Sequence, residues 1–391
     1  MEKVLILNAG SSTVKFQLFN NETDAVLASG VVDRIGIPGS YAEIKIEDKK
    51  VKQEQDFKNH KEGIELVLQM LIENNVMNSL AEIIKVGHRV VQGAEEFKEP
   101  TLVQPDTLQK IKDLAALAPL HNLPNAQGIE VIQELLPNVK NILSFDTEFH
   151  QTIPQESYLY ATPMSWYTDY KVRRYGMHGI SHKYVSNKSA ELRGVKVDEQ
   201  SVIVCHLGNG ASLSAVKNGK CIQTSMGLTP LEGVVMGTRS GDIDPAIIEY
   251  MCKQTGKTVE EITHELNFES GIKGISGISS DFRDIKEAMD KGDERAKIAM
   301  KIYITRLVEY IGSYYFRLGG VDAIIFTAGI GENSRDVRKL LVKELAFLGI
   351  KLDEKANEEN ELFISTKDSQ VDVMIIPTNE EYQILQETKK F

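Results

Sequence analysis

Several signatures of common nucleotide-binding and hydrolase classes are missing from this chain. The sequence contains neither the GxxxxGK[ST] motif of P-loop proteins nor a GxGxxG motif after a predicted strand. These absences exclude the P-loop class and the Rossmann dinucleotide fingerprint. The GxSxG, HExxH and paired CxxC motifs are absent as well, so hydrolase, zincin and thioredoxin-like chemistry have no support in the sequence. A nucleotide site in this chain must therefore be built in another way.

Cysteine and long apolar runs are also scarce. The three cysteines are odd in number and lack the spacing of metal sites, which favours a reducing compartment. No apolar run reaches the roughly 20 residues needed to span a bilayer. The strand predicted at residues 3–7 leaves no room for a signal peptide. We therefore expect a cytoplasmic protein that does not enter a membrane.

Positive charge is in the minority. The formal net charge is −11, which argues against nucleic acid or an anionic membrane as a partner. A small anionic substrate is still compatible with this charge if arginine and histidine gather locally. The length of 391 residues exceeds what one core comfortably supports, so two domains are expected.

A repeated strand–turn–strand pattern is the main positive signal. Residues 4–19 and 202–220 each contain an apolar strand, a turn of small residues and a second strand, and a third strand is expected after each. Small residues in such turns let backbone N–H groups approach an anion such as phosphate. One copy alone is better interpreted as an ordinary hairpin. Two copies favour two similar domains that face each other across a nucleotide.

The order of the remaining elements predicts an α/β fold. Strands are expected at 83–91, 141–146 and 322–328, and they alternate with helices, which is typical of a sheet with parallel pairing. A helix is expected at 61–79, with Ile64, Val67, Leu68, Leu71 and Ile72 on its buried face. Residues 114–136 are expected to form a helix, a proline-marked turn and another helix. Single helices are expected at about 245–265 and at 293–318, the latter ending at two glycines.

Residue types suited to anion chemistry follow the predicted strands. Arg89 and Asp146 each come at the end of a buried strand, Arg239 lies among glycines, and His178 lies between two glycines. Guanidinium groups suit bidentate contact with carboxylate or phosphate. A surface ion pair, a turn aspartate and a structural histidine are the alternatives. A third small-residue turn, at 329–333, joins a strand to a helix and would complete a clamp for an adenine nucleotide.

The motifs then match a known family in order and over essentially the full length. They are NAGSSTVKF (8–16), GHRVV, APLHN, FDTEFHQT, RRYGMHG, HLGNGAS, TSMGLTPLEGVVMGTRSGDIDP, SSDFRD, FTAGIGENS and PTNEE. On these motifs the chain resembles the acetate kinase family, within the superfamily of acetate and sugar kinases, heat-shock ATPases and actin. Any one motif would be a weak signal, whereas the ordered set is specific.

The resemblance implies a fold and a reaction. The fold consists of two duplicated ribonuclease H-like, actin-like ATPase domains of βββαβαβα type with a cleft between them. The N-terminal domain would comprise residues 1–147 plus the returning helix 379–391, and the nucleotide-binding domain residues 148–378. The reaction is reversible in-line transfer of the γ-phosphoryl group of ATP to acetate, which gives acetyl phosphate and ADP. The resemblance also implies a homodimer.

The resemblance assigns roles to individual residues. Asn8 and Glu380 would hold Mg²⁺, with Mn²⁺ as a possible substitute, and Lys15 would reach the phosphates. The catalytic group would be Asp146, His178 and Arg239. Arg89 would bind the carboxylate, and the acyl pocket would consist of Val91, Leu120, Met177 and Pro230. The remaining nucleotide contacts would be His206, Leu207, Gly208, Asn209, Gly210, Asp281, Phe282, Arg283, Gly329, Ile330, Gly331, Glu332 and Asn333.

The role of Asp146 has a more specific hypothesis. Acetate is already ionised and needs no base, so the carboxylate is expected to orient Mg²⁺, water or Arg239 rather than to accept a proton.

Some positions depart from the family pattern. Gln92, Ala94, Glu148 and Ile180 differ from the usual residues, and HNLPN replaces HNPAN. Met177 matters most, because it replaces a phenylalanine of the acyl pocket and a flexible methionine could admit a longer chain. Propionate or butyrate kinase is therefore an alternative within the family. A non-catalytic ATP switch like actin is the alternative outside it, although such a protein has no need for Arg89, His178 and Arg239 together.

Overall fold

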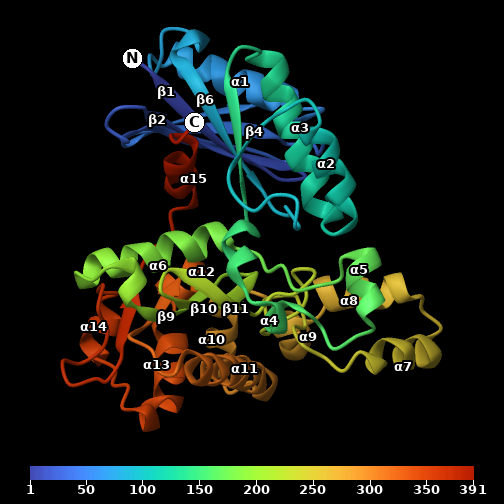
Figure 1. Cartoon of the computed structure of the whole chain (residues 1–391), viewed down its shortest axis with the longest axis vertical. Coiled ribbons are helices and arrows are strands. Elements are labelled where there is room, and N and C mark those ends of the chain that lie inside the picture. Colours follow the sequence, from blue (N-terminus) through green and yellow to red (C-terminus); the bar gives the residue numbers. More distant parts are fainter. The chain divides into compact units, whose positions relative to one another are not determined.

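The computed structural model describes residues 1–118 and 121–391 (Figure 1). The chain divides into two compact units. Unit 1 comprises Met1–Glu148 and Asn379–Phe391, and unit 2 comprises Phe149–Thr378. Each unit contains one sheet with helices packed against it, so the predicted α/β class is confirmed. In the described part of the chain, no helix combines the length and the apolar character required to cross a bilayer.

Unit 1 is built on an eight-stranded sheet in the order β5-β4-β3-β2-β1-β6-β8-β7. The neighbouring pairs from β1 to β5 are antiparallel, whereas β6 runs parallel to β1 and β8 parallel to β6. The carboxyl ends of β1, β6 and β8 therefore reach the same edge of the sheet. The strands are β1 (Lys3–Ala9), β2 (Thr13–Asn20), β3 (Val26–Asp33), β4 (Tyr41–Ile46), β5 (Lys49–Glu54), β6 (Ile83–Val90), β7 (Thr101–Leu102) and β8 (Lys140–Phe145).

Among the described residues of unit 1, four α-helices cover this sheet: α1 (His60–Glu73), α2 (Thr107–Asp113), α3 (Pro119–Leu135) and α15 (Glu380–Thr388). Helix α1 begins at Asn59, whose side chain accepts a hydrogen bond from the Glu62 N–H at 3.1 Å. Its predicted apolar face is confirmed, since Ile64, Val67, Leu68 and Leu71 are buried and Ile72 packs against the same core.

The last helix, α15, packs on the strands of unit 1. A methyl group added at Gly87 on β6 would lie 2.7 Å from Ile6 Cδ1 and 2.8 Å from Ile384 Cγ2. Such distances are too short for real contacts, so β6 needs a glycine here to let α15 approach. This close packing holds the first residue of α15, Glu380, in unit 1.

The segment around Pro124 differs from its prediction. The sequence predicts a helix, a proline-marked turn and another helix over residues 114–136, but Pro124 lies inside the single helix α3. Asn122 exchanges two hydrogen bonds with the backbone of Gln92, at 3.0 and 2.9 Å. Asn125 accepts from the Val91 N–H at 3.1 Å and donates to the Ala9 carbonyl at 2.7 Å. These four tertiary hydrogen bonds hold the segment as a helix despite the proline.

Unit 2 has a five-stranded sheet in the order β11-β10-β9-β12-β13. The strands are β9 (Ser201–Leu207), β10 (Ala211–Lys217), β11 (Lys220–Thr224), β12 (Ala323–Thr327) and β13 (Asp372–Ile375). The first three are antiparallel, and β12 and β13 run parallel to β9. The run β3-β2-β1-β6-β8 of unit 1 has the same arrangement, so the predicted duplication is confirmed at the level of topology.

The α-helices of unit 2 are α4 (Gln155–Tyr158), α5 (Met164–Tyr170), α6 (Gly179–Arg193), α7 (Ala246–Thr255), α8 (Val259–Phe268), α9 (Gly271–Ser276), α10 (Phe282–Asp290), α11 (Glu294–Leu318), α12 (Ala328–Asn333), α13 (Arg335–Glu344) and α14 (Glu354–Glu358). Helix α11 begins one residue after its predicted start and ends at Leu318 as predicted, with Gly319 as its C-cap. The single helix expected at 245–265 is instead two helices, because Gly256 has a left-handed φ of 73° and Thr258 forms a capping box that begins α8.

Candidate functional site

Arg89 is the centre of a polar cluster in unit 1. It lies on β6, and Asp146 follows the neighbouring parallel strand β8, so the two residues meet at one edge of the sheet. Arg89 Nε donates to Asp146 Oδ1 at 3.0 Å, and Nη2 donates to Oδ2 at 2.7 Å. The Asp146 side chain is 1% exposed. This bidentate pair fixes the orientation of the guanidinium plane.

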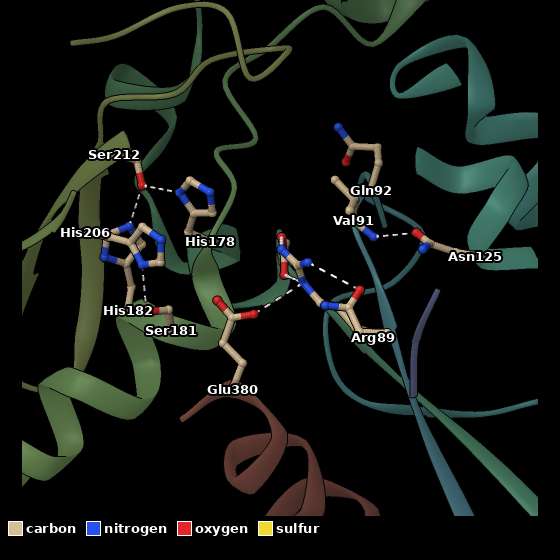
Figure 2. Close-up of polar contacts among 12 residues, drawn as sticks. Arg89, Val91, Gln92, Asn125, His178, Ser181, His182, His206, Ser212 and Glu380 are labelled. Atoms are coloured by element: carbon tan, nitrogen blue, oxygen red, sulfur yellow. Dashed lines mark hydrogen bonds and ion pairs between the residues drawn. The ribbon is translucent and has the colours of Figure 1, made fainter. Parts of the chain in front are cut away.

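Two further oxygen-bearing side chains contact the same guanidinium. Glu380 Oε2 lies 3.5 Å from Arg89 Nε (Figure 2). Asn8 Oδ1 accepts from Arg89 Nη1 at 3.4 Å. Burial raises the pKa of Glu380 to about 7; the Arg89 cation opposes this shift, and the negative charge of Asp146 adds to it. Two carboxylates thus share one guanidinium. The positive charge of Lys15, which pairs with Asn8 across β1 and β2, also acts to lower the pKa of Glu380.

The cluster in unit 1 has the donor chemistry of a Mg²⁺ site. Asn8, Asp146 and Glu380 supply hard oxygen atoms, and burial, with a smaller effect from the negative charge of Asp146, raises the pKa of Glu380. Within the described residues, no group of three or more His, Cys, Asp or Glu side chains could hold a metal ion. A divalent cation bound here would complete its shell with water or substrate oxygens, as Mg²⁺ commonly does.

In unit 2 the turn between β9 and β10 forms a narrow loop. The Gly208 N–H donates to the Gly210 carbonyl at 3.2 Å, and the Gly237 N–H donates to the Asn209 carbonyl at 3.0 Å. A methyl group added at Gly210 would lie 3.3 Å from Arg239 Nη1 and 3.8 Å from His178 Nε2. The loop backbone, a guanidinium and an imidazole therefore border one small space. All three are groups that can donate hydrogen bonds to an anion.

A cavity of about 960 Å³ opens beside this loop. The volume is at the upper end of the range of small-molecule sites. Ser280 and neighbouring residues of α10 and α13 contribute to its walls. The glycine segment expected as a turn at 329–333 forms the short helix α12 instead. The predicted nucleotide contacts in its lining are Gly208, Asn209, Asp281, Phe282, Arg283, Gly329, Ile330 and Asn333.

Among the other residues predicted to contact the nucleotide, Glu332 forms hydrogen bonds with backbone N–H groups of unit 2. Its carboxylate accepts from the Ala328 N–H at 2.8 Å and from the Thr378 N–H at 3.1 Å. Among the described residues that line the cavity, His206, Leu207, Gly210, Gly331 and Glu332 do not occur. Their predicted contacts with the nucleotide remain predictions.

The pair Asp281 and Arg283 marks the start of α10 at the cavity. Asp281 is the N-cap and accepts from the Arg283 N–H at 2.8 Å, and its carboxylate also pairs with the Arg283 guanidinium at 2.5 Å. The hydrogen bonds from Arg283 lower the pKa of Asp281 to about 2. The guanidinium is 91% exposed, so it can move to meet a ligand at little cost.

Arg338 was missed by sequence reasoning. It lies on α13 and is fully buried, and its guanidinium donates to the carbonyls of Gly331 and Glu332, both at 2.9 Å, and to Asn357 Oδ1 at 2.7 Å. It therefore holds the end of α12 in place. An arginine on an amphipathic helix normally predicts a solvated position, so the sequence offers no signal for this role.

A histidine cluster lies at the start of α6. His178 is the N-cap residue and has a left-handed φ of 63°, an uncommon conformation for a residue other than glycine. Ser212 Oγ lies 2.9 Å from His178 Nδ1 and 2.7 Å from His182 Nε2 (Figure 2). Burial lowers the pKa of His182 well below its ordinary value, with smaller effects from His150 and His206.

The same cluster extends to His206 on β9. The rings of His178 and His206 stack with their centroids 4.2 Å apart. His206 Nδ1 lies 2.8 Å from Ser181 Oγ, which lies 2.7 Å from Thr378 Oγ1. Sequence reasoning named His178 and His206 but missed the serines between the imidazoles. The RRYGMHGISH and HLGNGAS motifs contain Ser181 and Ser212, but they do not indicate that these serines contact the histidines.

Arg239 has a guanidinium without a carboxylate partner in the described residues. Its hydrogen bonds go from Nη1 to the Pro230 carbonyl at 3.4 Å and to Met236 Sδ at 3.8 Å. Partial burial lowers the pKa of Arg239 below its ordinary value. A partly desolvated cation with such weak partners favours the arrival of an anion.

The predicted acyl-pocket residues fall in different parts of the chain. Val91 belongs to unit 1, whereas Met177 and Pro230 belong to unit 2. Val91 and Met177 are both buried. Leu120 lies outside the described residues. Their joint role therefore stays a prediction.

The structure adds a partner for Asp146 that sequence reasoning did not name. The sequence-based hypothesis has Asp146 orienting Mg²⁺, water or Arg239. The side chain forms a bidentate ion pair with Arg89, and the sequence-based hypothesis stays a prediction. This partner follows from the parallel pairing of β6 and β8, which spacing along the sequence does not reveal.

Comparisons with known proteins cover the whole chain. The model of the acetokinase family matches residues 3–386. The acetate kinase of Clostridium novyi is 49% identical over 393 residues, which cover 99% of this chain and 98% of that protein. The solved structure of the acetate kinase of Porphyromonas gingivalis matches with a TM-score of 0.94 and 41% identity, over 100% of this chain and 99% of that one. A propionate kinase from Francisella tularensis matches with a TM-score of 0.95 and 42% identity, over 100% of both chains.

The order of the motifs, the duplicated sheets and these full-length matches agree. The close structural matches confirm the predicted fold class. This chain belongs to the acetokinase family.

Proposed function

We propose that this chain transfers the γ-phosphoryl group of ATP to acetate, giving acetyl phosphate and ADP, and that it catalyses the reverse reaction. One observation of the structure supports the proposal most directly. The loop at Gly210 is bordered by Arg239 and His178 and adjoins a cavity of nucleotide size. Two anion-binding side chains at the phosphate end of such a cavity suit phosphoryl transfer, which depends on positioning and charge neutralisation.

The chemistry needs no proton transfer at the nucleophile. A carboxylate oxygen of acetate attacks the γ-phosphorus, and the bond from that phosphorus to the bridging oxygen of ADP breaks. Arg239 neutralises charge on the transferring group, and His178 stabilises the same group by a hydrogen bond. Arg89 binds the acetate carboxylate, since Asp146 occupies two of its five N–H donors and leaves others available. Asp146 is thus a positioning residue for Arg89.

ATP and Mg²⁺ are the cofactors we propose. Asn8 and Glu380 would hold Mg²⁺, which when bound neutralises charge on the phosphate oxygens; Mn²⁺ could replace it. Lys15 would reach the phosphates from β2. The adenosine would lie in the cavity beside Asp281 and α12.

The reaction is tested by trapping acyl phosphate with hydroxylamine in the presence of MgATP and acids of two to four carbons. Acetate should give product. No product with any acid would overturn the proposal and would favour a non-catalytic ATP switch. A clear preference for propionate or butyrate would overturn acetate as the substrate while leaving a kinase.

Met177→Phe checks the origin of any tolerance for longer acids. The side chain is buried and flexible, so its replacement by a larger, stiffer ring should lower kcat/KM for propionate relative to acetate by up to about tenfold. The ratio of the two kcat/KM values is the measurement, with wild type as the reference. An unchanged ratio would remove Met177 from the acyl pocket.

We also propose that the protein is a cytoplasmic homodimer. Helix α7 supports an interface, because none of its ten residues is buried in the described structure and Ile247 and Tyr250 are exposed on it. Tyr250→Glu should convert the dimer, with twice the chain mass of 43.7 kDa, to a monomer in light scattering. A dimeric variant would place the interface elsewhere, and a monomeric wild type would overturn the homodimer.

A further inference from the structure

We propose that Ser212 and His182 hold His178 as a neutral imidazole with its proton on Nε2. His178 then donates a hydrogen bond to the transferring phosphoryl group without carrying a charge of its own. Ser212 and His182 are positioning residues in this scheme, which we call the tautomer lock. The role in phosphoryl transfer rests on the proposed function, whereas the protonation state of His178 does not.

The argument begins with one hydroxyl between two imidazoles. Ser212 Oγ lies 2.9 Å from His178 Nδ1 and 2.7 Å from His182 Nε2 (Figure 2). A serine hydroxyl has a single proton to donate. Ser212 can therefore donate to only one of the two nitrogens, and the other nitrogen must donate to it. The tautomers of His178 and His182 are coupled through this oxygen.

The burial of His182 decides between the two arrangements. Its side chain is fully buried, and its Nδ1 has no hydrogen-bond partner within the described part of the chain. Burial also lowers its pKa well below the ordinary value, so the ring is neutral and carries one proton. That proton lies either on Nε2, where Ser212 can accept it, or on Nδ1, where nothing accepts it.

An orphaned buried N–H is rarer and costlier than an orphaned acceptor lone pair. The proton of His182 therefore lies on Nε2 and is donated to Ser212. Ser212 in turn donates its own proton to His178 Nδ1. A nitrogen that accepts a hydrogen bond carries no proton, so the proton of neutral His178 lies on Nε2.

The same coupling opposes protonation of His178. An imidazolium would carry a proton on Nδ1 and would have to donate it to Ser212. The Ser212 hydroxyl would then either leave its own proton without an acceptor or turn to His182 Nε2 and displace the His182 proton to the unpartnered Nδ1. The groups that face His178 act in the same direction, because Arg239 borders the same space at Gly210 and a positive charge there disfavours a second one. The ring stacked on His178 is His206.

The position of His178 Nε2 explains why the tautomer matters for phosphoryl transfer. A methyl group added at Gly210 would lie 3.8 Å from His178 Nε2 and 3.3 Å from Arg239 Nη1, so the Nε2 edge and the guanidinium face one space beside the phosphate loop. The tautomer lock therefore presents an N–H donor where we propose that the phosphoryl group is transferred. In the other tautomer of His178, Nε2 would carry a lone pair in place of the proton, and this lone pair would face the phosphoryl anion.

The tautomer lock is tested by ¹⁵N NMR of the full-length protein with labelled histidine, in which the two ring nitrogens report protonation separately. His178→Gln assigns the His178 signals. In wild type, His178 Nε2 should carry the proton and Nδ1 should not, with no imidazolium between pH 6 and 8 as an approximate working range. A proton on Nδ1, or titration of His178 within that range, would overturn the inference.

Two variants separate positioning from packing. Ser212→Ala should lower kcat by about tenfold or more while KM for ATP changes less than about twofold, because the donor is misplaced and the nucleotide cavity is intact. Ser214→Ala is the matched control: it lies two residues along the same strand, its hydroxyl is equally buried, and in the described structure that hydroxyl has no partner. An equal effect of both variants would reduce Ser212 to packing and overturn its role.

His182→Phe removes the donor that fixes the Ser212 hydroxyl while keeping a ring of similar size. Ser212 could then accept from His178 Nδ1, so imidazolium signals of His178 should appear at higher pH than in wild type. Unchanged signals would overturn the part assigned to His182.

The tautomer and the activity can fail independently. If the tautomer is found as expected but the wild-type protein makes no acyl phosphate, the proposed function fails and the tautomer lock stands. If the protein makes acyl phosphate while His178 carries its proton on Nδ1, the tautomer lock fails and the proposed function stands.

Discussion

Asp146→Asn should lower kcat by about 10³-fold, comparable with the loss of a preorganised contact to the transition state. An amide has one oxygen where the carboxylate has two, and its NH₂ group would face an N–H donor of Arg89. The bidentate pair at 3.0 and 2.7 Å would be lost. The guanidinium would then be free to turn toward Glu380, which lies 3.5 Å away, and away from the substrate carboxylate.

The measurement is kcat and KM for acetate by hydroxylamine trapping, together with the thermal midpoint of unfolding. Asp372→Asn is the matched control, because it makes the same chemical change at another Arg–Asp pair, with Arg193 Nε at 2.9 Å. The control should keep its activity. Near-normal kcat in Asp146→Asn would show that the charge of Asp146 is dispensable and would contradict the role proposed for it.

Arg239→Gln should also lower kcat by about 10³-fold, but without lowering Tm. Arg239 is partly buried and has only a carbonyl at 3.4 Å and a thioether at 3.8 Å as partners in the described structure. Its removal relieves an uncompensated charge in the free protein, and burial already lowers its pKa. The substitution also removes the cation that we expect to neutralise charge on the transferring phosphoryl group, so kcat should fall.

Arg338→Gln provides the opposite case in the same unit. Arg338 is fully buried, and its guanidinium is saturated by oxygen acceptors that include the carbonyls of Gly331 and Glu332. Its loss leaves those carbonyls unpaired and should lower Tm by about 5 °C or more. Calorimetry of the two variants is the check. A lower Tm in Arg239→Gln would mean that Arg239 stabilises the fold, and the assignment to anion binding would lose its physical basis.

The sequence predicted what depends on local pattern. The two hairpins, the apolar face of α1 and the end of α11 at Gly319 were all anticipated, because strand alternation, helical spacing and glycine caps act over a few residues. The break between α7 and α8 was missed, although Gly256 and Thr258 carry ordinary stop and start signals. The continuous α3 was not predictable in this way, since the hydrogen bonds of Asn122 and Asn125 come from distant backbone.

The candidate site was likewise predictable only in part: its residues could be named from local motifs, but their contacts could not. Motifs that follow strands identified Arg89, Asp146, His178 and Arg239 as residues of interest. They did not identify which side chains meet. The pairing of Arg89 with Asp146 depends on strand order in the sheet. The placement of Ser212 between two histidines depends on how α6 packs on β9 and on how β10 pairs with β9. Such contacts are set by tertiary structure and leave no periodic trace in the chain.

The membership of α15 in unit 1 has a consequence for biosynthesis. Residues 380–388 complete the packing on β6, where Gly87 has no side chain to obstruct them, yet the ribosome makes them after every residue of unit 2. During translation, the face of the first sheet that α15 covers therefore stays exposed while about 230 intervening residues emerge and fold. The helix that delivers Glu380 also closes this unit, so maturation of the polar cluster around Arg89 is deferred to the end of synthesis.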